Sequence, residues 1–403
     1  MQTKIKETLK KTARGKEADN ILRSCVHCGF CNATCPTYQL LGDELDGPRG
    51  RVYLIKQALE GQSVSDKTQR HLDRCLTCLA CETTCPSGVR YSHLLDIGRE
   101  WVEQRVTRRW REAFKRKALR AILPYPNRFK PLLRLGQWLR PLLPFKLKKT
   151  IPVRQPAKIA WPTTQHSRTM LILEGCVQPA IAPNINAAAA QVFDRLGISL
   201  LRAKGCCGGI SQHLAAPEEA RQFMRRNIDA WWPLIEAGAE AFVITASGCG
   251  SVVKEYAYYL QSDPDYADKA KHISELTYDI SEVLAKLDLA SFQAVGNNRK
   301  VAFHAPCSLQ HGQKIMGVVE SILKAAGFEL TAVPDAHLCC GSAGTYSILE
   351  KELSEQLLEN KMNALVSGSP EVIATANIGC LSHLASVAAL PVVHWVELLA
   401  DVS

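Results

Sequence analysis

The sequence predicts a multidomain α+β protein in which an α-helical domain is followed by two duplicated α/β lobes. Three observations predict this architecture. Two short Cys-rich runs, each ending in Cys-Pro, lie fifty residues apart near the N-terminus. From residue 169 onward, three Cys-bearing segments occur twice at a nearly constant spacing, and each copy alternates short apolar runs with helical patterns. The expected domains are residues 1–98, 99–162, 163–290 and 291–403.

The two N-terminal runs share the spacing C-x2-C-x2-C-x3-C-P. This is the spacing of bacterial ferredoxins with two clusters, in which the fourth Cys of each run is a ligand of the other cluster. We therefore expect an α-helical ferredoxin domain with two [4Fe-4S] clusters. The expected ligands of the first cluster are Cys25, Cys28, Cys31 and Cys85, and those of the second are Cys75, Cys78, Cys81 and Cys35.

Zinc and disulfides are the alternatives for these cysteines. Zinc ribbons use two Cys pairs about 15 to 20 residues apart, and that spacing is absent here. Disulfides are disfavoured because residues 1–16 are polar and amphipathic, unlike a signal peptide. The expected location is a reducing compartment, the bacterial cytoplasm.

The net charge of +10 is concentrated in one part of the chain. Residues 99–158 contain eighteen Lys and Arg against three Asp and Glu, so the remaining chain is acidic. Nucleic-acid binding would require this charge on a recognisable binding fold with aromatic platforms, and the pattern contains none. We therefore expect no nucleic-acid partner.

The N-terminal domain is expected to be built from short helices at residues 7–24, 53–59 and 66–74. Residues 41–51 between them are rich in turn-forming types. Their backbone N–H groups are expected to face a cluster, where hydrogen bonds to sulfur help set its reduction potential. A plain surface turn is the alternative.

The basic segment 99–162 is expected to connect the domains. It begins as a charged helix up to about residue 123, after which closely spaced prolines are expected to end any long helix. No run reaches the roughly 18 apolar residues needed to cross a bilayer. Basic residues interleaved with Leu, Trp and Phe favour a segment that lies on anionic lipid or on a partner subunit, with a solvated linker as the alternative. A peripheral position on the inner membrane is therefore compatible with the cytoplasmic location.

Each C-terminal lobe alternates strand and helix patterns, which predicts parallel sheets covered by helices. In the first lobe, strands are expected at residues 169–173, 198–202 and 241–245, and helices at 184–196 and 217–237. In the second lobe, strands are expected at residues 301–304, 328–333 and 372–375, and helices at 318–326 and 348–366.

Eight further cysteines follow the expected C-terminal ends of these strands, where open α/β sheets bind ligands. They form two matching sets: Cys176, Cys206, Cys207 and Cys249, and Cys307, Cys339, Cys340 and Cys380. Adjacent thiols rarely form a disulfide with each other, so ligation of a soft metal is favoured over structural burial. A further iron-sulfur cluster, a zinc ion, or one site shared between the lobes all remain open.

The chain resembles the iron-sulfur subunits of glycolate oxidases (glycolate dehydrogenases) over nearly its whole length. The resemblance rests on the two Cys runs, the two Cys-Cys-Gly segments, and residues 43–51 and 227–232. The iron-sulfur subunits of anaerobic glycerol-3-phosphate dehydrogenase, lactate-utilisation complexes and heterodisulfide reductase are similar. The resemblance implies a hetero-oligomeric complex whose flavoprotein subunits carry FAD and oxidise glycolate to glyoxylate. This chain would pass the electrons towards quinone or another respiratory acceptor.

No G-x-G-x-x-G follows an expected strand, so the chain shows no flavin site of its own. We therefore expect the electron-transfer subunit of an acceptor-linked oxidoreductase acting on CH–OH, without catalytic residues for the substrate. One alternative is disulfide reduction by the Cys-Cys-Gly lobes, as in heterodisulfide reductases. Their final C-x-x-C element is missing here, because Val252 and His383 stand at the position of its second Cys. His304, His311 and His383 are considered as ligands but are expected to be ordinary histidines.

Overall fold

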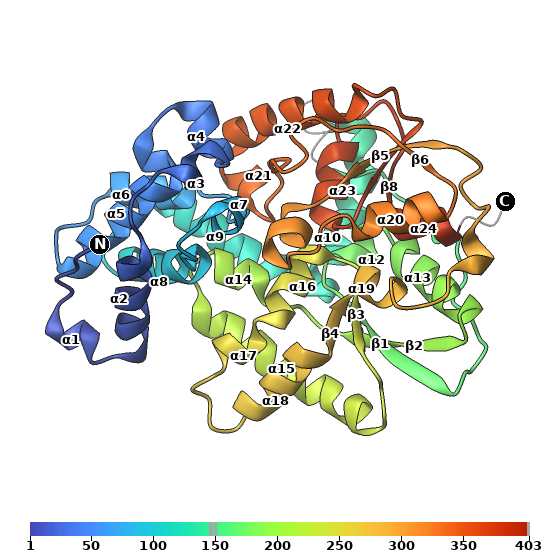
Figure 1. Ribbon diagram of the computed structural model, residues 1–403, viewed down its shortest axis with the longest axis horizontal. Helices are drawn as coiled ribbons and strands as arrows, with labels where there is room; N and C mark the ends of the chain where they lie inside the picture. The colour runs from blue at the N-terminus through green and yellow to red at the C-terminus, as the bar shows by residue number, and fades with distance from the viewer. Residues whose placement is uncertain (145–147, 149–150, 401–403) are drawn as a thin grey trace. The chain divides into compact units, whose positions relative to one another are not determined.

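The computed structural model describes residues 1–144, 148 and 151–400 (Figure 1). Residues 145–147 and 149–150 of the expected connecting segment, and residues 401–403 of the expected second lobe, lie outside the described residues. The chain folds into two compact units. The first unit consists of Met1–Leu119, Ser211–Pro217 and His337–Lys361, and the second consists of the rest. The expected domain bounds stay predictions.

The first unit is helical. Its core is formed by apolar side chains that are fully buried, among them Leu22, Ile55, Leu59 and Leu94. The helices that belong to it wholly or in part are α1 (Glu7–Lys10), α2 (Ala13–Ser24), α3 (Phe30–Ala33), α4 (Pro36–Leu41), the 3-10 helix η1 (Glu44–Asp46), α5 (Pro48–Glu60), α6 (Asp66–Asp73), α7 (Ala80–Thr84), α8 (Tyr91–Glu103), α9 (Trp110–Ile122), α14 (Gly209–His213), α21 (Tyr346–Leu349) and α22 (Lys351–Val366).

Two expectations for this unit are wrong in detail. The helix expected at residues 7–24 is two helices, because Thr12 starts α2 by accepting a hydrogen bond from Gly15 N–H. The turn-rich stretch expected at residues 41–51 ends early, because Pro48 begins α5. Proline suits the first turn of a helix, where the backbone N–H has no partner within the helix. Gly50 and Arg51 are therefore helical.

The connecting segment also contains more helix than expected. Helix α10 spans Pro126–Leu139 and continues through Pro131. The proline removes one intrahelical hydrogen bond. Burial of Leu133 and the hydrogen bond from Gln137 Nε2 to Pro152 O, at 3.1 Å, offset this loss. The 3-10 helix η2 (Arg140–Leu142) follows it. Among the described residues, no helix is both long enough and apolar enough to cross a membrane.

The second unit contains two four-stranded sheets in which every paired strand is parallel, as expected. The first sheet has the order β2-β1-β3-β4, with β1 (Arg168–Glu174), β2 (Ile198–Lys204), β3 (Phe242–Ile244) and β4 (Thr277–Asp279). The second has the order β6-β5-β7-β8, with β5 (Lys300–His304), β6 (Glu329–Leu330), β7 (Val372–Thr375) and β8 (Val392–His394). The edge strands β4 and β8 are three residues long, too short for a period-2 pattern to predict.

Helices cover the first sheet on both faces (Figure 1). One face packs against α15 (Pro217–Glu236), α17 (Tyr256–Tyr259) and α18 (Ala267–Leu276), and the other against α13 (Asn184–Arg195) and α19 (Ile280–Leu284). The remaining helical segments of this unit are α12 (Gln178–Ile181), α16 (Ser247–Lys254), η3 (Ala290–Phe292), η4 (Ser308–Gly312), α20 (Val318–Ala325), α23 (Ile378–Ala385) and α24 (Trp395–Ala400).

The two sheets share one hydrophobic core and contact each other through equivalent loops. Val243 of β3 and Phe303 of β5 belong to the same buried cluster. After the strands, Ser247 N–H donates to Ala376 O at 3.1 Å. His394, whose pKa burial lowers to about 4, is neutral at pH 7 and bonds Thr245 O through Nε2 at 2.8 Å. The duplicated lobes are therefore packed around a common centre.

Candidate metal centres

The two N-terminal Cys runs fold in the same way. His27 and Gly29 of the first run have φ values of 56° and 86°, and the matching Thr77 and Leu79 have 54° and 63°. This conformation turns backbone N–H groups back towards sulfur: Thr77 N–H donates to Cys75 Sγ at 3.4 Å, and His27 N–H bonds Cys25 in the same way. A leucine rarely adopts positive φ, so the surrounding structure imposes this loop shape.

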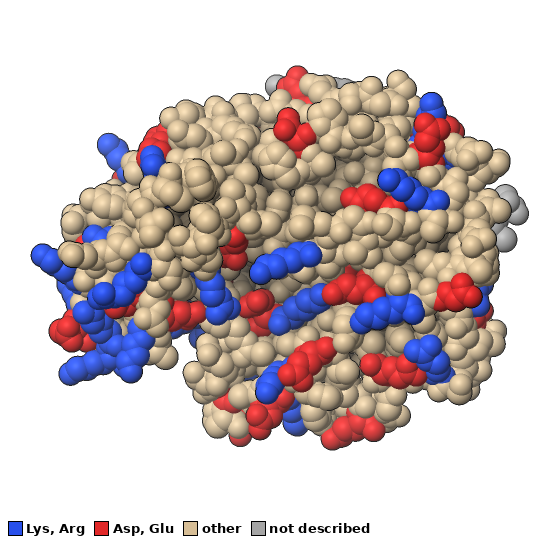
Figure 2. All heavy atoms as spheres, viewed as in Figure 1, with Lys and Arg blue, Asp and Glu red and all other residues tan. Residues whose placement is uncertain are grey.

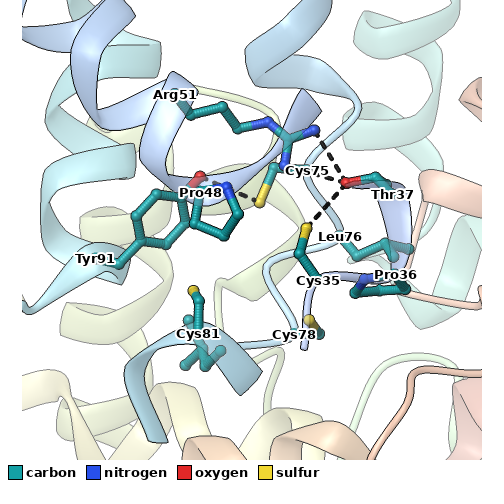
Figure 3. A pocket seen from close by; sticks show the side chains of 11 residues that line it. Cys35, Pro36, Thr37, Pro48, Arg51, Cys75, Leu76, Cys78, Cys81 and Tyr91 are labelled. Carbon is teal, nitrogen blue, oxygen red and sulfur yellow. Dashed lines mark hydrogen bonds between the residues drawn. The ribbon is translucent and has the colours of Figure 1, made fainter. Parts of the chain in front are cut away.

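Four thiols line one small cavity in the first unit (Figure 3). They come from both runs: Cys75, Cys78, Cys81 and Cys35. Burial raises the pKa of Cys81 well above its usual value, and the neighbouring thiols raise it further. Burial also acts on Cys75, yet the guanidinium groups of Arg51 and Arg99 hold the pKa of that thiol below its usual value. We name this group the inner site.

The other four N-terminal thiols form a second group, which we name the outer site: Cys25, Cys28, Cys31 and Cys85. Burial raises the pKa of Cys31 to about 11, with further contributions from the other three thiols. Cys28 is exposed to solvent. Each site thus combines three cysteines of one run with the fourth of the other, the crossed arrangement that the spacing predicts, while ligation itself stays a prediction.

The residues of both sites fit an iron-sulfur cluster. Each site offers four thiols at one place and a backbone N–H group directed at sulfur. Irons of a cubane cluster take thiolate ligands, and hydrogen bonds to sulfur and burial tune the cluster's potential. Such a group would supply one-electron transfer, which these side chains cannot perform alone.

A third group of thiols meets in the second unit, at the C-terminal ends of β1, β2 and β3. Hydrogen bonds with Cys176 and Cys207, followed by burial, raise the pKa of Cys206 well above its usual value. A hydrogen bond with Cys207, followed by burial, does the same for Cys249. The structure therefore brings together the whole predicted first-lobe set, and a cluster of buried thiols suits a soft metal ion.

Helix α15 holds the Cys-Cys loop of this group in place. Asn227 Nδ2 donates to Cys206 O at 2.7 Å, and Trp231 Nε1 donates to Lys204 O at 2.9 Å. Tyr256 Oη completes the support by donating to Cys207 O at 3.1 Å. Gly205 is required because a Cβ there would lie 2.2 Å from Asn227 Oδ1. The resemblance carried by residues 227–232 thus has a physical basis.

The second-lobe cysteines divide between the two units, two in each. In the first unit, Gly341 N–H donates to Cys339 Sγ at 3.4 Å, and Cys340 is buried beside it. In the second unit, Asn377 Nδ2 donates to Cys380 Sγ at 3.6 Å, and Cys307 follows β5. The strand expected at residues 328–333 is only Glu329–Leu330, so Cys339 does not directly follow a strand end. The four-Cys ligand set of this lobe stays a prediction.

His304 is the histidine that the structure brings to a candidate site. A ring nitrogen of His304 and the Cys380 sulfur lie within 4.8 Å of each other, and both side chains are buried. The sequence does not predict this pairing, because the two residues are far apart in the chain, and a ligand role for His304 is untested. The position of His304 at the end of β5 was the available signal.

Comparisons with known proteins agree with this architecture. The sequence pattern of the family described as 4Fe-4S dicluster domain matches residues 21–89, and that of the family described as cysteine-rich domain matches residues 170–254 and 301–385. The fold and sites therefore define an iron-sulfur protein with one dicluster domain and two cysteine-rich domains.

The relatives narrow this class. The chain is 57% identical to the glycolate oxidase iron-sulfur subunit of Escherichia coli (strain K12), over 99% of this chain and 98% of that protein. It is 29% identical to a probable glycolate oxidase iron-sulfur subunit of Bacillus subtilis (strain 168), over 90% and 88%. Lactate utilization protein A of Bacillus velezensis matches 52% of this chain at 29% identity, over 87% of its own length. The chain belongs to the family of glycolate oxidase iron-sulfur subunits.

Proposed function

We propose that this chain is the electron-transfer subunit of a flavin-dependent glycolate (2-hydroxy acid) dehydrogenase complex. It takes electrons from a partner flavoprotein and passes them towards quinone or another respiratory acceptor while glycolate is oxidised to glyoxylate. The observation that carries this proposal is the pair of four-thiol sites in one compact unit. The name of the relative with 57% identity supports glycolate as the substrate of the complex.

In this proposal each N-terminal site holds one [4Fe-4S] cluster and the FAD belongs to the partner subunits. The inner site binds through Cys35, Cys75, Cys78 and Cys81, and the outer site through Cys25, Cys28, Cys31 and Cys85. The chain's own residues hold the sulfur atoms in place, bury Cys35 and Cys81 of the inner site, and direct N–H groups at sulfur. The first-lobe thiols hold a third metal centre, either an iron-sulfur cluster or zinc.

In this proposal the electron path continues from the inner site to the second Cys-Cys-Gly segment, part of which lies in the same compact unit. Tyr346 and Cys339 belong to the same compact unit as the two runs. Burial raises the pKa of Tyr346, and the Glu350 carboxylate raises it further, ahead of smaller effects of Cys75 and Cys339.

Purification of the native complex tests this division of labour. We expect glycolate to bleach the flavin of the partner subunits under anaerobic conditions, and the iron-sulfur absorbance of this chain to bleach afterwards. The isolated chain should show no response to glycolate, because it supplies no hydride acceptor. Metal analysis of the same sample distinguishes a third cluster from zinc. Turnover of a disulfide by the isolated chain with reduced viologen would instead support a heterodisulfide-reductase-like role.

We further propose that the complex lies peripherally on an anionic membrane surface through α10. Its exposed apolar side chains follow one helical stripe: Leu132, Leu135, Trp138 and, in η2, Leu142. Arg128 and Lys130 are exposed on the same helix. Apolar side chains beside Lys and Arg are the combination that lies at the interface of anionic lipid.

Part of the remaining basic charge of residues 99–158 is paired within the protein. Arg108 contacts Asp73 at 2.6 Å and Glu112 at 2.5 Å, and Arg116 contacts Asp73 at 3.0 Å. On the face drawn in Figure 2, Lys and Arg gather over α1 and α2, whereas both signs alternate over α15 and α18. The lipid proposal therefore rests on the exposed face of α10 rather than on the total charge.

Sedimentation with vesicles tests the proposed lipid surface. We expect the double variant Leu135→Ser, Trp138→Ser to bind vesicles of phosphatidylcholine and phosphatidylglycerol at least about tenfold more weakly, since each buried apolar side chain contributes about 1.5–3 kcal/mol. The matched control is Leu201→Ser, an exposed apolar residue on β2. Equal binding by both variants contradicts the lipid proposal, and loss of the partner subunit from the double variant would assign this face to a subunit contact.

A further inference from the structure

The inner site has a cationic side chain in its wall that is almost completely withdrawn from water. The Arg51 side chain is 1% exposed and lines the cavity together with the four thiols (Figure 3). Its Nε donates to His71 O at 2.7 Å, and both terminal nitrogens donate to Thr37 Oγ1 at 3.2 Å. Thr37 Oγ1 in turn lies 3.3 Å from Cys35 Sγ. The guanidinium is therefore held at a fixed place beside the sulfur atoms.

The charge of Arg51 is only partly neutralised. Its carboxylate partner is Asp46, at 3.4 Å, which is also fully buried. Asp46 is shared, because Arg74 contacts it at 2.8 Å and His71 at 3.0 Å. A second buried guanidinium, that of Arg99, donates to Cys75 O at 2.8 Å. Among the described residues, the surroundings of the inner site thus contain more buried cations than anions.

The outer site has a different electrostatic environment. Cys28 is exposed, and the neighbouring Arg49 side chain is 37% exposed and bound to Glu44 at 2.6 Å. The N-terminal ammonium donates to Cys25 O at 2.8 Å, partly exposed to solvent. Solvent and salt screen exposed charges much more than buried ones. These cations therefore act on the outer site less strongly than Arg51 acts on the inner one.

We propose that Arg51 makes the inner site the higher-potential one of the two, so that electrons which arrive at the outer site are drawn inward. Reduction adds one negative charge to a site, and a fixed cation in a medium of low dielectric constant stabilises the reduced form more than the oxidised form. In the transfer, one electron leaves the outer site, which is oxidised, and enters the inner site, which is reduced. No bond or proton is exchanged.

The surface around Cys28 fits the role of an entry point for electrons. Val26 is 67% exposed and Phe30 is 62% exposed, and both belong to the same run as Cys28. A small apolar surface next to an exposed thiol site suits brief contact with a redox partner. The direction of flow rests on the proposed function, in which reduced flavin of a partner subunit is the electron donor. The order of the two potentials is a property of this chain alone.

A redox titration of the full chain, monitored by electron paramagnetic resonance, tests the role of Arg51. We expect Arg51→Gln to lower the midpoint potential of the inner site by at least about 59 mV, a tenfold change in the electron-exchange equilibrium for a one-electron couple. Arg51→Lys should retain most of the wild-type separation. The matched control is Arg49→Gln, which removes an exposed guanidinium beside the outer site and should leave the inner site unchanged. The Cys28→Ser variant, which alters the outer site, shows which of the two resonance signals belongs to each site.

A second variant, expected to shift the inner-site potential in the opposite direction, keeps the test decisive if Arg51→Gln fails to take up its cluster. Asp46→Asn removes the shared carboxylate and leaves Arg51 and Arg74 in place, so it should raise the potential of the inner site. The proposal would be overturned if Asp46→Asn left the midpoint potential of the inner site unchanged. It would also be overturned if Arg51→Gln and Arg49→Gln shifted that potential equally. Absence of glycolate oxidation by the unmutated complex, with the two potentials in the expected order, would instead contradict the proposed function. Failure of the proposed function and failure of the proposal for Arg51 are therefore distinguishable.

Discussion

Replacing Cys78 by Ser is expected to abolish acceptor-linked glycolate oxidation by the complex, by at least about 100-fold, while glycolate still bleaches the partner flavin. Cys78 lines the inner site together with Cys35, Cys75 and Cys81. A hydroxyl is a poor ligand for iron in place of a thiolate, so the inner site should lose its cluster and interrupt the path for electrons. Dye- or quinone-linked turnover and anaerobic flavin bleaching measure the two halves of this result.

The matched control is Thr83→Ser, which changes an exposed side chain on the neighbouring helix α7. It should leave turnover, bleaching and iron content unchanged. Loss of flavin bleaching in Cys78→Ser would show that the chain takes part in substrate oxidation itself. Full turnover in Cys78→Ser, with the inner cluster absent, would show that electrons do not pass through the inner site.

The second large effect is expected in the first lobe, where Cys207→Ser should release the metal proposed for the second unit and leave the two proposed N-terminal clusters in place. Cys207 is the thiol that connects the group, since it bonds Cys206 and Cys249. Metal analysis, together with the resonance signals of the N-terminal clusters, measures this loss. The identity of the lost element, iron or zinc, then identifies the centre.

Tyr256→Phe is the control for this variant, because it removes the hydrogen bonds of Tyr256 Oη to Cys207 O and from Asn227 Nδ2 without removing a thiol. It should retain the metal and lower stability by about 2 kcal/mol. Circular dichroism checks that both variants are folded. Equal metal content in Cys207→Ser and in the unchanged chain would mean that the four thiols are structural.

Local patterns were enough to predict most elements of the fold. The alternation of apolar runs and helices predicted six of the eight strands that the structure describes, and the missing β4 and β8 are short edge strands. Closely spaced prolines predict no long helix after residue 123, whereas α10 continues through Pro131 with Leu133 buried. These errors arise where tertiary contacts outweigh local propensity.

The sequence by itself determined the class of the protein, the repeat, and the crossed partition of the eight N-terminal cysteines. Thiol spacing carries this information because the reach of a short loop limits which sulfur atoms can meet. Only the tertiary structure decided which side chains surround those thiols. Arg51 lies in a segment expected to be a turn, and its helix buries the guanidinium against the inner site. Likewise, His304 meets Cys380 only because β5 and β7 are neighbours in one sheet. Burial and neighbouring charge depend on packing between distant segments, which residue spacing does not encode.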